Sequence, residues 1–288
     1  MWPATSFNLD RALIKLYTKP MDIFIGRQSI AWGTGYAFNP TDLWNMKSPV
    51  DPTAPKIVIN AFRAEIPLGD MAGVSLVAST GREFKHSSGG VRVKWNIGNF
   101  DMSISGLSIM NADREMFSLK KKLVAGTDLA GQIGDIGVWY EVAVSNPVYS
   151  DITNFDSLFS QVDLGVDYTF TNGLYIMAEY LYNSLGDKDS KEYTLYDMAK
   201  VAGGEAPGLA KSYLFGGLRR ELGGQVSIGL FGLANLNDIS GLFLPQINYT
   251  FNDHIDIELK GIISAGDKTT TEYGSMKSAV QFVIAGYF

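Results

Sequence analysis

Residues 162–170 read Val-Asp-Leu-Gly-Val-Asp-Tyr-Thr-Phe, in which apolar residues alternate with polar residues or glycine without a break. A strand turns successive side chains to opposite faces, whereas a helix would scatter this apolar row around its circumference. Residues 91–97, Val-Arg-Val-Lys-Trp-Asn-Ile, repeat the pattern, and residues 255–260 do so again. This period of two predicts β-strands that each have one apolar face.

The composition restricts the class of protein. The chain has 288 residues, 46% of them hydrophobic, so it can bury a large apolar surface. No run approaches the roughly 18 consecutive apolar residues that a transmembrane helix needs. A net charge of -6 leaves no basic stripe to neutralise phosphates, which argues against nucleic acid as a partner. The absence of cysteine suits a chain that crosses an oxidising periplasm and folds without disulfides.

Turn signals divide the chain into about fifteen strands. Asn172-Gly173 and Gly223-Gly224 lie between alternating stretches, as hairpin turns do. The expected strands are 8–18, 22–32, 56–67, 72–80, 90–98, 101–110, 121–131, 135–145, 159–171, 174–184, 212–222, 225–236, 240–251, 254–265 and 276–288. The expected tight turns are 19–21, 68–71, 98–100, 134–135, 172–173, 223–224 and 252–253. The connections between them are 33–55, 81–89, 111–120, 146–158, 185–211, 237–239 and 266–275, all but 237–239 long.

Tight turns at one rim and long loops at the other are typical of a transmembrane antiparallel up-and-down β-barrel. We therefore expect an all-β chain that forms a single transmembrane β-barrel domain over residues 1–288, with its longest outer loops at 33–55 and 185–211. Aromatic residues lie near the expected strand ends, where girdles meet the lipid headgroups. They are Tyr17, Trp32, Trp95, Tyr168, Phe170, Tyr180, Tyr182, Tyr249, Phe251 and Phe288.

The C-terminal strand carries a second indication of this class. Residues 280–288 form a mostly apolar row of period two that finishes on the last residue. The row resembles the closing strand of bacterial outer-membrane proteins, which ends in an aromatic residue. That resemblance implies that Phe282, Ile284 and Phe288 form the signal read by the barrel-insertion machinery. An ordinary buried C-terminal strand is the alternative.

The strand count makes a further prediction. If the tight turns are periplasmic, the strand 8–18 runs downward, and residues 1–7 would start on the extracellular side. Barrels of this class have an even number of strands, and the resemblance to them implies a periplasmic N-terminus. We therefore expect one upward strand and a signal peptide before Met1, and sixteen strands in the complete protein. Met1-Trp2-Pro3 itself is no signal peptide. A strand wrongly divided or merged within 111–131 would undo the count.

In such a barrel the apolar row of each strand faces lipid and the polar row faces the lumen. The expected lumen-lining residues are Arg11, Lys15, Arg27, Arg63, Glu65, Arg92, Lys94, Asp128, Glu141, Asp163, Asp167, Glu179, Arg219, Glu221, Asp256, Glu258, Lys260, Lys277 and Gln281. The basic ones gather in the first third of the chain and the acidic ones follow, so a basic wall would face an acidic wall across a water-filled channel. A lumen filled by salt bridges is the alternative.

Residues 25–45 contain Gly26-Arg27-Gln28, then Trp32-Gly33, then Asn39-Pro40-Thr41-Asp42. This segment resembles one found in several porin-like outer-membrane families of Gram-negative bacteria, many of them uncharacterised. The resemblance covers about twenty residues and implies a porin-type barrel with Arg27 pointing inward, without identifying a substrate. The loop either folds inward as a constriction or forms an ordered external cap. The residues expected at such a constriction are Tyr36, Asn39, Asp42 and Trp44.

The loop at 185–211 contains one stretch with helical spacing. Tyr193, Tyr196, Met198 and Val201 give a weak apolar face within residues 191–204, which predicts a short helix over the barrel mouth. The Asp-x-Asp spacing at residues 187–189 lacks the later glutamate of a calcium loop. No metal and no cofactor are expected.

Enzymatic activity is not expected either. The two histidines, His86 in an outer loop and His254 at a periplasmic turn, lie at opposite rims and cannot share a site. Outer-membrane hydrolases use a histidine with a carboxylate or serine near one rim. His86 beside Glu83, Ser87 and Ser88 is the candidate for such a site, and a solvated loop histidine is the favoured alternative.

Three functional hypotheses follow, each placing the protein in the bacterial outer membrane. The first is passive or weakly selective diffusion of small polar or charged solutes. The second is a substrate-specific channel or exporter for oligosaccharides or anionic polymers. Its basic ladder would be Arg11, Lys15, Arg27, Arg63, Arg92 and Lys94. The third is a non-conducting structural or adhesin-like barrel. Expected partners are the lipid bilayer, the insertion machinery and small solutes; a homo-oligomer is left open.

Overall fold

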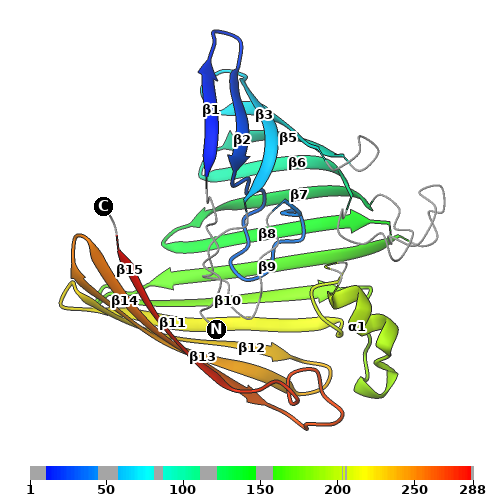
Figure 1. The fold of residues 1–288 in the computed structure, drawn as a ribbon, viewed down its shortest axis with the longest axis vertical. Coiled ribbons are helices and arrows are strands. Elements are labelled where there is room, and N and C mark those ends of the chain that lie inside the picture. The colour runs from blue at the N-terminus through cyan, green and yellow to red at the C-terminus, as the bar shows by residue number, and fades with distance from the viewer. Residues whose placement is uncertain are drawn as a thin grey trace, which may run out of the picture.

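The computed structural model describes residues 11–44, 58–80, 87–110, 122–146, 158–202, 204 and 206–286. They form one sheet in which the strands follow one another in chain order, each antiparallel to its neighbours (Figure 1). The strands are β1 (Ala12–Tyr17), β2 (Asp22–Gln28), β3 (Ile59–Pro67), β4 (Ala72–Ser79), β5 (Ser88–Ile97), β6 (Phe100–Ile109), β7 (Lys122–Ile133), β8 (Ile136–Ser145), β9 (Phe159–Thr169), β10 (Leu174–Asn183), β11 (Ser212–Leu222), β12 (Val226–Asn235), β13 (Ser240–Asn252), β14 (Ile255–Ala265) and β15 (Ala279–Gly286). The predicted all-β, up-and-down organisation with fifteen strands is confirmed.

The two ends of the sheet differ in their connections. At one end, which we call the turn rim, the connections are 18–21, 68–71, 98–99, 134–135, 170–173, 223–225 and 253–254. Gly134 (φ 63°) and Gly173 (φ 80°) adopt the left-handed backbone that such turns require. At the other end, the loop rim, the connections are 29–58, 80–87, 110–121, 146–158, 184–211, 236–239 and 266–278. The alternation agrees with the predicted asymmetry.

The register assigns each strand side chain to one of two faces. One residue on each strand from β5 to β9 is the register partner of the next, so the side chains of these residues share a face. They are Lys94, Ser103, Asp128, Glu141 and Asp163. We call this the inner face, because the segment that follows β2 lies against it. The opposite face is the outer face.

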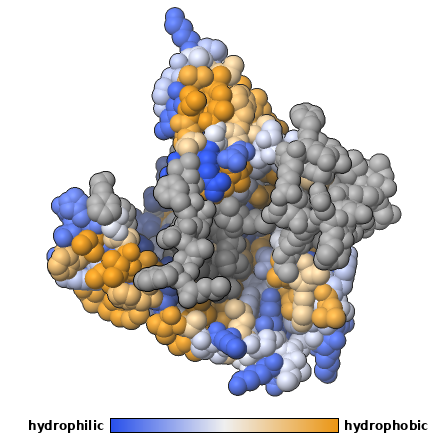
Figure 2. All heavy atoms as spheres, viewed as in Figure 1, coloured by the Kyte–Doolittle hydropathy of each residue, from blue (hydrophilic) through white to orange (hydrophobic). Residues whose placement is uncertain are grey.

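The outer face is an apolar surface left uncovered. Every one of the fifteen strands contributes at least one exposed, large hydrophobic side chain to it. Among them are Ile14, Ile25, Phe62, Leu76, Val91, Ile104, Leu123, Val144, Leu164, Ile176, Leu214, Ile228, Phe243, Leu259 and Phe282. Figure 2 shows hydrophobic side chains gathered at the lower left, where Figure 1 places β13 to β15. Soluble monomers rarely expose an apolar surface of this extent.

The sheet is open among the described residues. β1 and β15 are its two edges, and neither pairs with the other. Because neighbours alternate in direction, these two odd-numbered strands run parallel to each other. The predicted closed barrel is therefore seen here as an open sheet.

Two elements differ in detail from the prediction. The strand expected at 22–32 ends at Gln28, because residues 29–32 leave the sheet and turn onto its inner face. The helix expected within 191–204 is present as η4 (Ser190–Glu192) and α1 (Leu195–Ala202). Leu195 on α1 is 85% exposed, so this residue does not pack over the sheet. None of the helices in the described ranges is long and apolar enough to cross a membrane.

One contact between strands predicts a large effect of a single methyl group. Gly165 lies opposite Trp139, and a β-carbon at this position would overlap the indole ring. We expect Gly165→Ala to destabilise the folded state by about 1–3 kcal/mol, the usual cost of overpacking. The matched control is Gly106→Ala, where the nearest atom to the new carbon is a Val91 methyl at 3.9 Å. Urea unfolding in detergent measures both; an equal loss for the two variants would contradict the assignment.

Candidate functional site

Residues 29–44 lie against the inner face and form what we call the inner segment. Ile30, Trp32 and Trp44 are buried against side chains of β3 to β8, including Val77 and Leu107. The rings of Trp32 and Trp44 meet edge to face, with centroids 6.1 Å apart. The segment folds inward, so of the two arrangements left open by the sequence the external cap is not the one observed.

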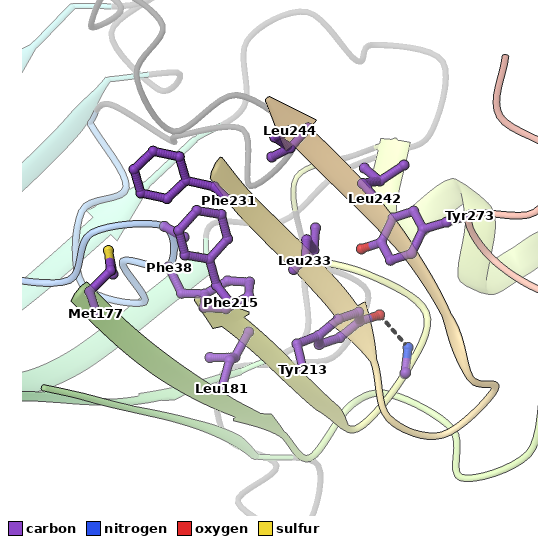
Figure 3. Close-up of a cluster of buried hydrophobic side chains, with 12 residues drawn as sticks. Phe38, Met177, Leu181, Tyr213, Phe215, Phe231, Leu233, Leu242, Leu244 and Tyr273 are labelled. Carbon is purple, nitrogen blue, oxygen red and sulfur yellow. Dashed lines mark hydrogen bonds between the residues drawn. The ribbon is translucent and has the colours of Figure 1, made fainter. Parts of the chain in front are cut away.

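The other half of the inner segment reaches the opposite part of the sheet. Ala37 and Phe38 join a buried apolar cluster from β10 to β13 (Figure 3). Its strand members are Met177, Leu181, Tyr213, Phe215, Phe231, Leu233, Leu242 and Leu244. The ring of Tyr36 packs against both Phe215 and Phe231, at 5.8 and 6.0 Å between centroids. One segment thus contacts the inner face from β3 to β13, which requires that face to be concave.

Glycines allow the segment this close approach. Gly33 has a φ of 94°, and a β-carbon there would lie 2.5 Å from a carboxylate oxygen of Glu141. At Gly35 a β-carbon would overlap the carbonyl of Phe38 and lie 2.9 Å from Asp163 Oδ2. Both positions therefore need glycine for the backbone to reach the carboxylates of the sheet.

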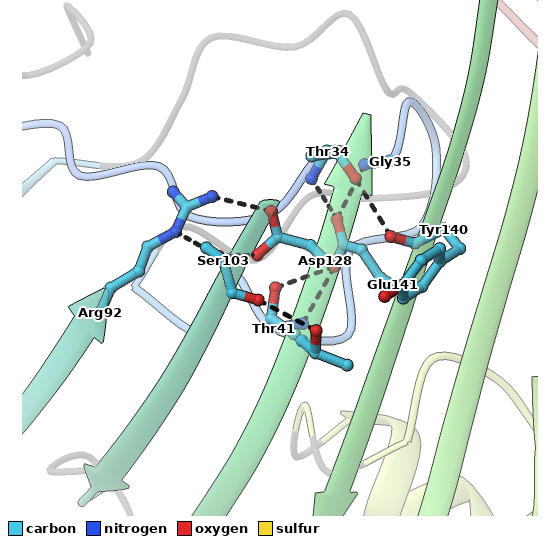
Figure 4. Close-up of polar contacts among 9 residues, drawn as sticks. Thr34, Gly35, Thr41, Arg92, Ser103, Asp128, Tyr140 and Glu141 are labelled. Carbon is cyan, nitrogen blue, oxygen red and sulfur yellow. Dashed lines mark hydrogen bonds and ion pairs between the residues drawn. The ribbon is translucent and has the colours of Figure 1, made fainter. Parts of the chain in front are cut away.

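Glu141 on β8 is the first of two anchors. Its Oε1 accepts hydrogen bonds from the backbone N–H groups of Thr34 and Gly35, the latter at 2.8 Å (Figure 4). Its Oε2 accepts from the N–H of Thr41 at 3.2 Å and from the Thr41 hydroxyl at 3.0 Å. The side chain is fully buried. Both oxygens of a buried carboxylate are thus satisfied by the inner segment.

Glu179 on β10 is the second anchor. Its Oε2 accepts from the N–H of Tyr36 at 2.7 Å, and its Oε1 accepts from Ala37 at 3.0 Å and Phe38 at 2.6 Å. Consecutive N–H groups that converge on one carboxylate form an anion-binding concavity. Asp163 on β9 is the register partner of Glu141 and is also fully buried. The segment therefore covers an acidic wall on β8 to β10.

Two arginines on the other part of the inner face are paired with carboxylates. Arg92 Nη2 lies 2.9 Å from Asp128 Oδ1, and Arg92 Nε donates to the hydroxyl of Ser103 at 2.8 Å (Figure 4). Arg63 Nε lies 3.7 Å from Glu65, and its guanidinium stacks 4.2 Å above the ring of Phe24. These pairs leave little net positive charge on the predicted basic wall.

A cavity of about 620 Å³ lies beside the inner segment, on its turn-rim side. Thr34 of the segment bounds it, and strands β2 to β7 together with the tight turn 68–71 supply the remaining walls. Its charged lining residues are Asp22, Glu65, Asp70, Arg92, Lys94, Asp101 and Asp128. The cavity is large enough for several water molecules, and its charged lining residues alternate with apolar ones such as Ile66, Trp95 and Met102.

The register places most of the predicted lumen-lining residues on the inner face. They are Lys15, Arg63, Glu65, Arg92, Lys94, Asp128, Glu141, Asp163, Asp167, Glu179, Arg219, Glu221, Asp256, Glu258, Lys260 and Gln281. Arg11 and Lys277 are described but precede β1 and β15. The constriction candidates Tyr36, Asn39, Asp42 and Trp44 all lie in the inner segment, where Asp42 and Trp44 are buried.

Arg27 differs from its prediction. Its register partners are Ala12 and Asn60. Phe24, an even-numbered residue of β2, pairs with the inner-face Arg63, whereas Arg27 is odd-numbered. Arg27 therefore shares the outer row with Ile23 and Ile25, and its inward orientation is not what the register gives. The physical reason is parity: a strand that places Phe24 inward must place every odd-numbered neighbour outward.

The other candidates lie apart from the inner segment. Phe282 and Ile284 are in the outer row of β15, opposite Leu259 and Ile257, whereas Phe288 is outside the described residues. Glu83 and His86 are also outside them. His254 lies in the tight turn before β14. Within the described ranges no group of three or more His, Cys, Asp or Glu side chains could hold a metal ion.

Another carboxylate, Glu272, joins the connections at the loop rim. Glu272 accepts from the N–H of Leu209 at 3.0 Å, the hydroxyl of Tyr213 at 2.7 Å and the amide of Asn235 at 2.8 Å. Burial raises its pKa, and these hydrogen bonds oppose the shift. Glu272 was not predictable as a special residue, because nothing in residues 266–275 distinguishes a carboxylate held by several hydrogen bonds from a solvated one.

No protein-family model matches the chain, and no curated protein matches it. Function is therefore inferred from the side chains and geometry described above.

The anchors make a direct prediction. Glu141→Gln or Glu179→Gln places an amide NH₂ where backbone N–H groups now donate, and removes hydrogen bonds to charge that contribute about 1.5–3 kcal/mol each. We expect hydrogen exchange of the amides in residues 34–38 to accelerate by at least about tenfold, measured by mass spectrometry. Glu192→Gln, on the exposed η4, is the matched control. Unchanged protection in both anchor variants would show that apolar packing alone holds the segment.

Proposed function

We propose that this protein is an outer-membrane, porin-like channel for passive or weakly selective diffusion of small polar or charged solutes. The observation that carries the proposal is the contrast between the two faces. All fifteen strands leave apolar side chains uncovered on the outer face, whereas the inner face carries charged side chains. This is the arrangement that a membrane barrel with an aqueous interior needs, and the inverse of a soluble sheet protein.

Aromatic side chains at the turn rim support the membrane location. Trp95, Phe100, Tyr168 and Tyr249 lie in outer rows close to the tight turns. Tyr168 and Phe170 meet edge to face at 4.8 Å between ring centroids. Amphipathic rings at this level are favoured in the headgroup layer.

A membrane location also requires that both edges of the sheet be paired, because lipid offers no hydrogen bonds to free backbone groups. β1 and β15 run parallel, so one strand antiparallel to both satisfies both edges at once. The resulting barrel has sixteen strands, a size that leaves a water-filled lumen in known porins.

The inner segment sets the width of the lumen in this proposal. It crosses the inner face from β3 to β13 and is held by Glu141 and Glu179. A solute passes through the space that the segment leaves open, such as the cavity bounded by Thr34. Passage then depends on size and on the charges along the wall.

The paired basic residues favour a general channel over the anion-guiding alternative. That alternative needs a continuous row of available cations. Arg63 and Arg92 are each bound to a carboxylate, and Arg27 lies in the outer row. The ladder is therefore interrupted at three of its expected positions.

The membrane part of the proposal predicts a strong position dependence for a charged residue. Leu164 is half exposed in the outer row of β9, and we expect Leu164→Arg to weaken folding into lipid vesicles by about 2–4 kcal/mol. Leu195→Arg makes the same change on α1, outside the sheet, and serves as the matched control. Urea titration in phosphatidylcholine vesicles measures both. Equal tolerance of the two substitutions would contradict the membrane location.

The channel part predicts stable conductance steps from the protein in a planar bilayer. Loosening the inner segment widens the passage, so the steps of Glu179→Gln are expected to be larger than those of the unaltered protein. Glu192→Gln again serves as the control and should leave the steps unchanged. Folded, inserted protein that gives no steps would overturn the channel and favour the non-conducting structural barrel.

A further inference from the structure

The charges on the inner face are not distributed evenly along the strands. Close to the tight turns, the inner rows carry the carboxylates Asp22, Glu65, Asp101, Asp167, Glu221 and Asp256. They come from strands spread across the sheet, from β2 to β14. The basic inner-row groups nearest to them, Lys15, Arg63, Lys94 and Arg219, are each one inner-row position or more farther from the turns.

From this distribution we infer that the channel prefers cations to anions, and that inner-row carboxylates at its turn-rim mouth set the preference. The inference rests on the proposed function and names the class of solute favoured by it. A permeating ion meets the carboxylates first at this mouth, and rings of carboxylates favour cations in channels. A narrow aqueous passage with low-dielectric walls strengthens the field of each charge.

Pairing inside the lumen involves equal numbers of cations and carboxylates, so the preference depends on the side chains that form no ion pair. The basic groups of Arg92 and Lys260 are bound to Asp128 and Glu258, at 2.9 and 3.1 Å. In the part of the chain that the structure describes, Asp22, Glu221 and Asp256 form no ion pair. Three basic side chains in the same region, Lys15, Lys94 and Arg219, form none either. The preference thus depends on the difference between opposing charges, so we expect a moderate ratio of potassium to chloride permeability.

The cavity beside the inner segment also has more acidic than basic lining residues, which agrees with a preference for cations. Asp22, Glu65, Asp70 and Asp101 all line it. Of its two basic lining residues, Arg92 is bound to Asp128 and Lys94 is not ion-paired within the described ranges. An ion held up at the constriction therefore rests in a space with more negative than positive charge.

Two sets of variants test the assignment by moving the selectivity in opposite directions. Glu221→Gln combined with Asp256→Asn removes two carboxylates from the mouth, and Lys94→Gln removes an opposing cation. Asp135→Asn, in the exposed tight turn between β7 and β8, is the matched control. Each protein is inserted into a planar bilayer under a potassium chloride gradient, and the reversal potential gives the ratio of potassium to chloride permeability.

The unaltered protein should favour potassium. The double variant should bring the ratio toward one, Lys94→Gln should raise it, and Asp135→Asn should leave it unchanged. Chloride preference in the unaltered protein, or an unchanged ratio in both test variants, overturns the inference and leaves the channel standing. Failure of inserted, folded protein to conduct overturns the proposed function, and the inference with it.

Discussion

Two buried carboxylates determine where the inner segment lies, and most other features of the interior depend on that position. Burying Glu141 and Glu179 as isolated ions would be costly, because a carboxylate loses its hydration when it leaves water. Burying the backbone N–H groups of residues 34–41 without partners would be costly as well. Each set satisfies the other. The acidic wall and the segment are therefore stable in this arrangement only together.

The apolar contacts of the segment follow from the same anchoring. Once residues 34–38 are held over β8 to β10, Trp32 reaches the strands on one side and Phe38 reaches those on the other. Phe215 and Leu233, which face inward and would otherwise meet water, are covered at this point. An inner face that carries charged side chains on many of its strands thus gains a local core, while the outer face keeps its apolar rows uncovered.

The strands were predictable from sequence because their signal is local. The alternation in residues 162–170 and the glycine at position 173 depend only on neighbours in the chain. The end of β2 was not predictable in this way, since Ser29-Ile30-Ala31-Trp32 is by itself compatible with a strand. What removes them from the sheet is contact with residues such as Leu107, distant in sequence. The two anchors were found as inward-facing carboxylates, but their partners are backbone groups that any residue carries.

The sign of the charge along the inner face was likewise not predictable from the local sequence. Along the sequence, basic residues lie in the first third of the chain and acidic residues follow, a distribution that predicts two opposed walls. In the folded sheet, Arg92 is bound to Asp128, which lies two strands away, and Arg63 is bound to Glu65 on its own strand. Pairing neutralises these cations together with their partner carboxylates, whereas Asp22, Glu221 and Asp256 near the turns form no ion pair in the described part of the chain. The sign of the interior field is therefore a property of the register, which decides which charges meet, and not of the composition alone.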